Sequence, residues 1–95
     1  MADYFIAKVT VNDAEAYAEY GKRFYAVFEK YNGTVLAADG DYEVLEGECG
    51  VDKLVIVSFP SAADLKAWYD SPEYQELVAI RAAASDAEVL LVHGI

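Results

Sequence analysis

The sequence predicts an α+β fold in which one antiparallel sheet carries its helices on a single face. Stretches rich in β-branched and aromatic residues alternate with stretches whose apolar residues recur at helical spacing. The helical stretches begin at residues suited to capping free backbone N–H groups. Because 95 residues allow one domain and leave little room for a second, we expect a single domain over residues 1–95.

The first two predicted elements are a strand at residues 4–11 and a helix that follows it directly. The strand is rich in aromatic and β-branched residues, which suit a half-buried pleated surface. Asn12 is predicted to cap the helix, because Glu15 stands three residues further on, at capping-box spacing. The Asn32–Gly33 pair is predicted to end it. The apolar stripe of this helix consists of Tyr17, Tyr20, Phe24, Val27, Phe28 and Tyr31.

The middle of the chain is predicted to form three strands. Residues 34–38 and 42–46 are short strands, and Asp39–Gly40 between them is a hairpin signal, since a tight turn needs a residue that tolerates positive φ. The third strand covers residues 53–59 and is stopped by Pro60.

The last third of the chain is predicted to hold a broken helix and a final strand. Ser61 caps the first helical stretch, and Ser71 caps the second, which has Pro72 at its first position. The final strand covers residues 86–93. Apart from the extra short strand at residues 42–46, the order is β-α-β-β-α-β with the second helix broken in two, which is the ferredoxin-like arrangement.

The two longest apolar strand segments, residues 54–57 and 89–92, are apolar on both faces. A sheet backed by helices on one side normally turns polar side chains toward water on the other. We therefore expect a second copy of the chain to cover the outer face, which makes a homodimer joined sheet to sheet. The alternative is that both faces are covered within one subunit.

The composition argues against two classes of partner. Seven Lys and Arg against 17 Asp and Glu give a net charge of −10, which repels nucleic-acid phosphates and anionic membrane surfaces. No apolar run is long enough to span a bilayer, and the N-terminus has no signal-peptide pattern. Cys49 is the only cysteine, which fits a reducing compartment, so we expect a cytoplasmic protein.

The sequence contains none of the usual motifs for zinc binding, nucleotide binding or a catalytic serine. One His and one Cys give none of the usual zinc spacings. Neither a glycine-rich dinucleotide loop nor a Walker loop is found, and the Gly-x-Ser-x-Gly motif is missing. We therefore expect no metal and no cofactor.

Four segments of the chain resemble a bacterial family known as domain of unknown function 1330. They are Val-Leu-Glu-Gly at 44–47, Phe-Pro-Ser at 59–61, Tyr-Asp-Ser-Pro-Glu-Tyr-Gln at 69–75 and Ile-Arg-Ala-Ala-Ala at 80–84. The resemblance covers essentially the whole chain. It implies a ferredoxin-like fold in the dimeric α/β-barrel superfamily, whose members include cofactor-free monooxygenases, lactone isomerases and haem enzymes with ligands bound between sheet and helices.

Two charged residues are candidates for chemistry. Arg81 falls on the same predicted helix face as Tyr74 and Leu77, where a guanidinium could grip the carboxylate or enolate of a ligand. Glu46 could act as general acid or base if its carboxylate is partly buried on the strand predicted at residues 42–46. The alternatives are an Arg81 whose head reaches water or forms a structural ion pair, and a Glu46 that is its partner.

A group of aromatic residues along the helices is a candidate ligand site. Eight Tyr in 95 residues is a high share, and Tyr offers a flat apolar body with one hydroxyl. These rings predict a cleft for a small aromatic compound, or else a core and an interface. The predicted ligand-binding residues are Tyr17, Tyr20, Phe24, Trp68 and Tyr69.

Three functions fit these residues. The first is a homodimer that binds a small organic molecule between sheet and helices, with or without transforming it by cofactor-free proton transfer or oxygenation. The second is a non-catalytic interaction module whose aromatic residues serve only packing and dimerisation. The third is haem binding by analogy with the superfamily, for which His93 is the only imidazole available.

Overall fold

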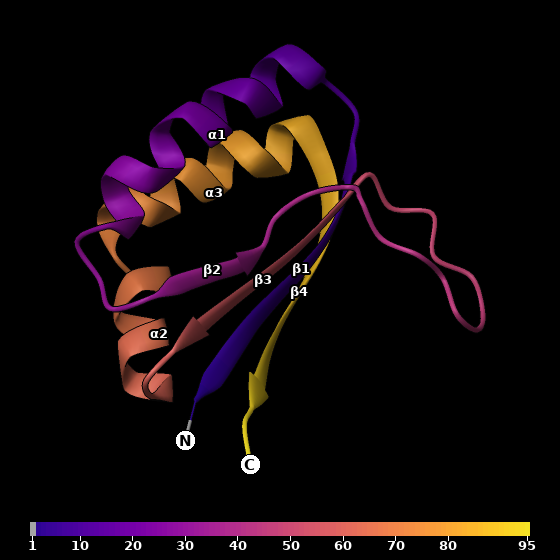
Figure 1. Ribbon diagram of the computed structural model, residues 1–95. Coiled ribbons are helices and arrows are strands. Elements are labelled where there is room, and N and C mark those ends of the chain that lie inside the picture. Colours follow the sequence, from indigo (N-terminus) through magenta and orange to yellow (C-terminus); the bar gives the residue numbers. More distant parts are fainter. Residues whose placement is uncertain (1) are drawn as a thin grey trace.

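The computed structural model describes residues 2–95. These residues form one sheet of four strands and three helices that pack against it (Figure 1). In chain order the elements are β1 (Asp3–Val11), α1 (Ala14–Phe28), β2 (Thr34–Ala37), β3 (Lys53–Phe59), α2 (Ala62–Tyr69), α3 (Pro72–Ala84) and β4 (Ser85–His93).

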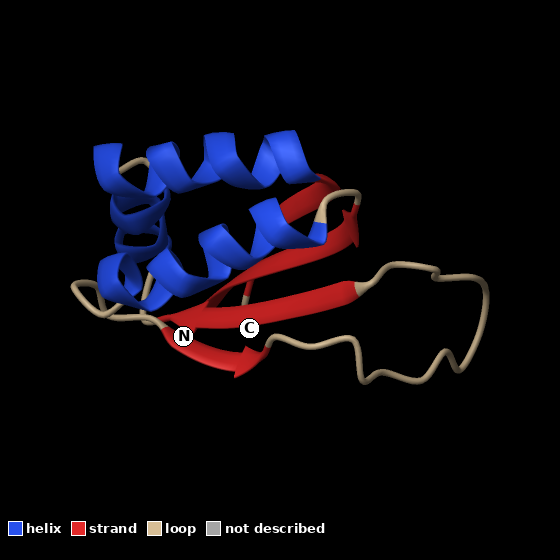
Figure 2. Ribbon diagram, turned by 90° about the horizontal axis from the view of Figure 1, so that it is seen from above, coloured by secondary structure: helices blue, strands red, loops and turns tan. Residues whose placement is uncertain are grey.

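The four strands form an antiparallel sheet in the order β2-β3-β1-β4. All three helices lie on one face of this sheet, with α1 and α3 running side by side across it and α2 at one end (Figure 2). In the register of the central strands, Phe5 lies between Val57 and Leu91. The predicted ferredoxin-like α+β fold is therefore confirmed.

The core lies between the helices and the inner face of the sheet. Trp68 on α2 and Tyr74 on α3 are fully buried, and their rings are 4.2 Å apart between centroids. Trp68 also contacts Phe59 from β3 and Phe5 from β1. Aromatic packing of this kind fixes the helices on the sheet, because each large ring buries a wide apolar surface.

The start of α1 differs from the sequence-based prediction by one residue. Asp13, not Asn12, is the N-cap, and its side chain accepts a hydrogen bond from the Ala16 N–H at 3.1 Å. The backbone N–H of Asn12 instead donates to the Ala84 carbonyl at 2.8 Å. Asn12 is thus held at the junction with the end of α3, and the capping position moves one residue further along.

The predicted strand at residues 42–46 and the predicted hairpin turn at Asp39–Gly40 are both wrong. Residues 38–52 form a long loop, here called the arm, that projects beyond the ends of β2 and β3 (Figure 2). β2 pairs directly with β3, and β1 occupies the other edge of β3. The arm closes on itself instead, because the Tyr42 hydroxyl lies 3.0 Å from the Cys49 carbonyl and 2.9 Å from that of Val51.

Gly40 has a different structural role from the one predicted. Its φ is not positive, since Gly47 is the glycine with positive φ (81°) among residues 2–95. A Cβ at position 40 would collide with the backbone carbonyl of Asp52. Glycine is therefore needed at this position for a close approach of two backbone segments at the base of the arm.

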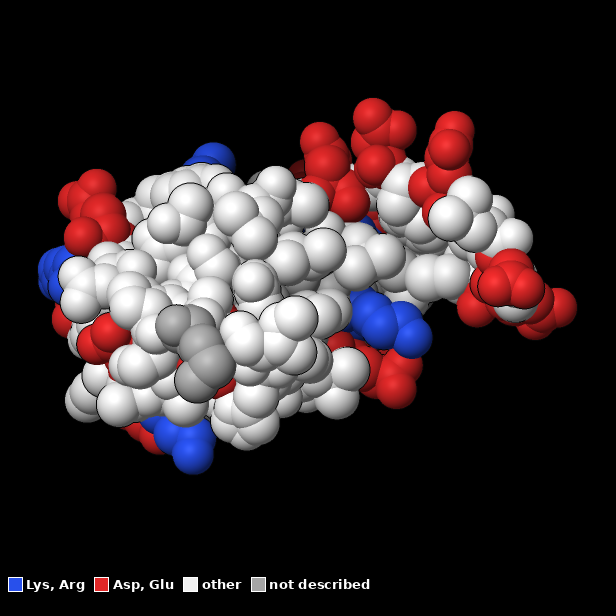
Figure 3. Space-filling model, turned by 60° about the horizontal axis from the view of Figure 1, so that its bottom comes forward, with Lys and Arg blue, Asp and Glu red and all other residues white. Residues whose placement is uncertain are grey.

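Within residues 2–95, no helix covers the outer face of the sheet, and this face is largely apolar. Ile6, Ile56 and Leu90 are paired neighbours across three strands, and Leu90 is 52% exposed. Further along the strands, Leu54 and Val92 add to the same face. Seen from below the sheet, uncharged side chains cover much of the surface, while Asp and Glu side chains gather on the arm (Figure 3).

Candidate functional site

A cavity of about 190 Å³ lies between α1 and the side of the sheet formed by β2 and β3. Its walls are mostly aromatic, because one face of α1 turns four rings toward it at helical spacing. The sheet and the base of the arm close the other side. The lining residues are Tyr17, Tyr20, Gly21, Phe24, Tyr25, Val35, Ala38, Lys53 and Val55.

The structure separates the five predicted ligand-binding residues into three groups. Tyr17, Tyr20 and Phe24 line the cavity. Trp68 is fully buried in the core and its Nε1 has no hydrogen-bond partner. Tyr69 lies at a second, more open groove of about 430 Å³ between α2 and the edge strand β4, away from α1.

Lys53 is a lining residue that the sequence analysis did not single out. It pairs with Val9, which is 1% exposed, so its side chain lies on the face that the helices cover. The Lys53 Nζ is 5.8 Å from the centroid of the Tyr17 ring, within the range of a cation–π contact. The sequence signal that could have identified Lys53 is the alternation of side chains between the two faces of β3. Residue 53 lies on the same face as buried Val57 and Phe59.

Behind the cavity wall lies a buried group of phenols around one guanidinium. The hydroxyls of Tyr20 and Tyr74 are 2.7 Å apart and share a hydrogen bond between α1 and α3. The Arg81 guanidinium lies 5.9 Å from the centroid of the Tyr20 ring. Burial raises the pKa of Tyr20, Tyr74 and Tyr17, of which Tyr17 is the least buried. The nearby positive charge of Arg81 acts in the opposite direction and lowers each pKa, but the effect of burial is larger.

Arg81 is only 6% exposed, and its Nε has no hydrogen-bond partner. Burial disfavours its charged form, but the hydroxyls of Tyr74, Tyr20 and Tyr69 offset this effect, and the pKa of Arg81 is raised above its ordinary value. No carboxylate is paired with Arg81 within residues 2–95. The guanidinium is thus held by aromatic neighbours rather than by an acid.

Glu46 lies on the exposed arm, and no hydrogen bond or ion pair joins it to Arg81 in the described part of the chain. One subunit therefore does not bring the two predicted catalytic residues together as a pair. Their catalytic roles stay predictions.

His93 lies at the far end of the sheet from the cavity. It pairs with Asp3 at the start of β1, whereas Lys53 pairs with Val9 near the end of that strand. Its Nδ1 is 2.6 Å from the Asp3 carboxylate, on the surface. Among residues 2–95, no three His, Cys, Asp or Glu side chains gather closely enough to hold a metal ion.

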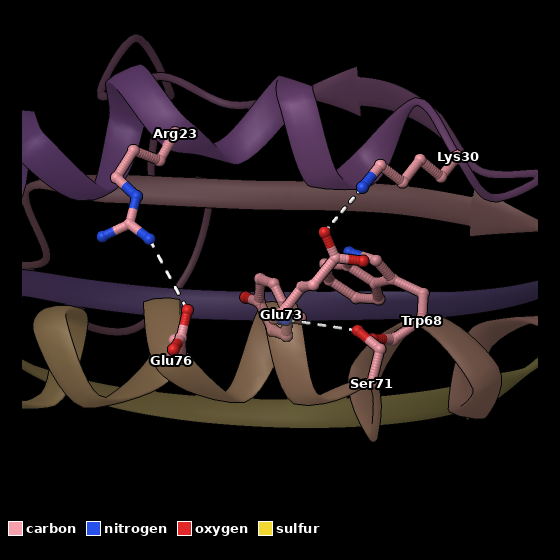
Figure 4. Close-up of polar contacts among 7 residues, drawn as sticks. Arg23, Lys30, Trp68, Ser71, Glu73 and Glu76 are labelled. Carbon is pink, nitrogen blue, oxygen red and sulfur yellow. Dashed lines mark hydrogen bonds and ion pairs between the residues drawn. The ribbon is translucent and has the colours of Figure 1, made fainter.

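The helix that forms the aromatic wall is tied to its neighbour on the solvent side. Arg23 on α1 and Lys30, just beyond the end of that helix, reach Glu76 and Glu73 on α3, with N–O distances of 3.7 and 2.6 Å (Figure 4). The hydrogen bond to Glu73 raises the pKa of Lys30. Exposed pairs of this kind add little stability, so the buried rings beneath them hold α1 in place.

The fold and the cavity together define the class of the protein: a ferredoxin-like α+β domain with an aromatic cavity between its sheet and its helices. The chain belongs to the family described as domain of unknown function (DUF1330), whose model matches residues 2–95. No curated protein matches the sequence. In the described residues no helix is both long and apolar enough to cross a membrane.

Solved structures share the fold over nearly the whole chain. A protein of unknown function from Rhodopseudomonas palustris, RPA0582, is 26% identical with a TM-score of 0.80, over 99% of this chain and 82% of its own. SnoaB, a cofactor-independent oxygenase from Streptomyces nogalater, is 14% identical with a TM-score of 0.68, over 99% and 93%. A dimeric ferredoxin-like protein of unknown function from Jannaschia sp. CCS1 is 12% identical with a TM-score of 0.70, over 99% and 100%.

Proposed function

We propose that the protein is a homodimer that binds a small organic molecule in the cavity between α1 and the sheet. The observation that carries this proposal is the cavity of about 190 Å³, with four aromatic rings and one ammonium group in its walls. Ligand sites are concave and mainly apolar, with a few polar groups that fix orientation. Tyr17, Tyr20 and Phe24 would form the ligand-binding wall.

The size of the cavity limits the ligand. An engineered apolar cavity of about 150 Å³ holds benzene, whereas drug-sized ligands need about 300–1,000 Å³. A single ring with a short substituent therefore fits within the space, whereas a fused polycycle would extend beyond it.

Any transformation of that ligand is proposed to be cofactor-free proton transfer or oxygenation, in line with the SnoaB likeness in fold. Arg81 would act through the Tyr20 and Tyr74 hydroxyls, because it lies behind the Tyr20 ring and is absent from the cavity lining. Glu46 would supply the acid or base only if the arm carries it to a cavity. A Glu46→Gln variant that retains full turnover of an identified substrate would remove this role.

The dimer is proposed to form through the outer face of the sheet. Each buried Val, Leu or Ile side chain contributes roughly 1.5–3 kcal/mol relative to exposure, and this face presents several of them without a cover. Two of the structural neighbours are described as dimeric ferredoxin-like proteins, which supports the same assembly for this chain.

The experiment for the binding function is a thermal-shift screen with small aromatic and acidic compounds on two variants of α1. Gly21→Leu places a side chain at the cavity, where a Cβ meets no atom within 4 Å. Ala18→Leu, at an exposed position of α1 outside the lining, is the matched control. We expect stabilising compounds to lose their effect on Gly21→Leu alone. Equal shifts in both variants would place the ligand elsewhere.

The second candidate is a non-catalytic interaction module, and the burial of the aromatic residues favours it. Phe59, Trp68 and Tyr74 are at most 1% exposed and are fully used in packing. A screen in which no compound stabilises the protein would support this candidate.

A further inference from the structure

We infer that the cavity selects a single-ring aromatic acid and that Lys53 is the residue that binds its carboxylate. The inference rests on the proposed function, since it names the ligand class of the same cavity. It starts from the position of Lys53, whose side chain lies on the inner face of β3 beside buried Val9. Lys53 is half-buried, and an ammonium group that is partly removed from water gains from an anionic partner.

Lys53 has no carboxylate partner within residues 2–95. The lysines at positions 8 and 30 each lie near a glutamate, at 3.9 and 2.6 Å. No Asp or Glu lines the cavity at all, although the chain carries 17 of them. The contact that Lys53 does make is with the Tyr17 ring, at 5.8 Å. A cation over a ring retains much of its capacity to bind an anion.

The other polar groups near the cavity do not favour a cationic ligand. The Tyr20 hydroxyl is already bonded to that of Tyr74, which does not line the cavity, so Tyr20 offers the cavity mainly its ring. The nearest buried charge is that of Arg81, which is also positive. The charged group in the lining and the buried charge behind it are thus both positive, in a protein whose net charge is −10. Both favour an anionic ligand over a cationic one.

The rings complete the ligand class. Tyr17, Tyr20, Phe24 and Tyr25 line the α1 side of the space, and their faces and edges suit a flat partner. A ring packed against α1 would leave its carboxylate on the sheet side, where Lys53 lies. The volume of about 190 Å³ admits benzoate or a benzoate with one small substituent.

The test compares three probes by isothermal titration calorimetry at pH 7: benzoate, benzamide and acetate. Benzamide keeps the ring and loses the charge, and acetate keeps the charge and loses the ring. We expect the parent protein to bind benzoate about tenfold or more tightly than benzamide, and acetate not measurably. In Lys53→Met we expect benzoate affinity to fall to the benzamide value, and Lys53→Arg to restore most of the preference.

Two controls separate the possible failures. Lys22→Met removes a charge from exposed α1 surface and should leave the benzoate preference unchanged. Unchanged benzamide binding by Lys53→Met shows that this variant is folded. Equal affinity of the parent for benzoate and benzamide would overturn the role of Lys53 and leave the proposed binding function standing. If neither compound binds, the proposed ligand class is overturned, and the thermal-shift screen with Gly21→Leu decides separately whether the cavity binds any small molecule.

Discussion

Gly21 is a glycine in the middle of α1, and its position at the cavity explains why it is tolerated there. A Cβ at this position meets no atom within 4 Å, so no close packing requires glycine. Glycine in a helix interior nevertheless costs about 0.8–1 kcal/mol relative to alanine. The residue thus lowers the stability of α1 and keeps the cavity wall open, as expected of a ligand site in which stability is given up for space.

The first prediction is that Gly21→Ala raises the free energy of unfolding by about 0.8–1 kcal/mol in urea denaturation. Gly33→Ala is the opposite case, because its Cβ would lie 2.5 Å from Cζ of Phe28 and 2.7 Å from Cε1 of Phe59. That variant should lose about 1–3 kcal/mol through overpacking. Destabilisation by Gly21→Ala would show that the helix backbone at this position does not accept a side chain.

At the scale of elements, α1 and α3 are joined by the buried phenols of Tyr17, Tyr20 and Tyr74. Burial raises the pKa of each one. The folded protein therefore keeps these protons at a pH where the unfolded chain, with tyrosine pKa values near 10, releases them. Since the unfolded state then binds fewer protons, the stabilising effect is complete below pH 10 and is lost as the pH rises above it.

The second prediction follows from this proton balance. The free energy of unfolding should fall above about pH 10, by up to about 1.4 kcal/mol per pH unit for each buried phenol. Urea denaturation between pH 9 and 11 measures the slope, which should be shallower in Tyr20→Phe. The exposed Tyr25→Phe serves as the control. If the slope were identical in Tyr20→Phe and in the parent protein, the Tyr20 phenol would not be a source of the pH dependence of stability.

The third prediction compares the two serine caps of the broken helix. The Ser71 Oγ accepts from the Tyr74 N–H and donates to the Trp68 carbonyl, and the residue is buried. Ser61 accepts from the Asp64 N–H alone and is partly exposed. We expect Ser71→Ala to cost about 2 kcal/mol and Ser61→Ala about 1 kcal/mol in thermal or urea unfolding. A larger loss from Ser61→Ala would contradict this order.

Elements with local signals were predictable from the sequence. Ser61 and Ser71 cap their helices as expected, and the bounds of β3 at Lys53–Phe59 agree with the prediction. The prediction of a strand at residues 42–46 was wrong because strand pairing is non-local. β2 pairs with β3 instead of with the segment that follows it. The hairpin turn predicted at Asp39–Gly40 was also wrong, because Gly40 allows a close approach to the Asp52 backbone and does not adopt positive φ.

The candidate site was harder to predict than the fold. Helical spacing placed Tyr17, Tyr20 and Phe24 on one face, and all three line the cavity. The same pattern could not separate them from Trp68, whose ring is in the core. Lys53 was missed because residues 54–57 are apolar on both faces, which hides the alternation that would place residue 53 inside.

For the whole molecule, the apolar outer face of the sheet is the surface through which we propose that two copies of the chain meet. The fourth prediction is that Ile56→Lys converts the proposed dimer to monomers in analytical ultracentrifugation, because the charge would lie between Ile6 on β1 and the partner sheet. Ala79→Lys, on the exposed side of α3, should leave the assembly unchanged. A dimer of undiminished stability in Ile56→Lys would mean that another surface joins the subunits.

The arm also gives the molecule a convenient spectroscopic handle. Cys49 is the only cysteine of the chain, and it lies half-buried on the arm, outside both the helix–sheet cavity and the outer face of the sheet. A nitroxide attached to this thiol would therefore report from each protomer of the proposed dimer without altering either surface. Pulsed electron resonance between two such labels would measure how the protomers are oriented, and repeating it with benzoate would show whether ligand entry shifts the arm.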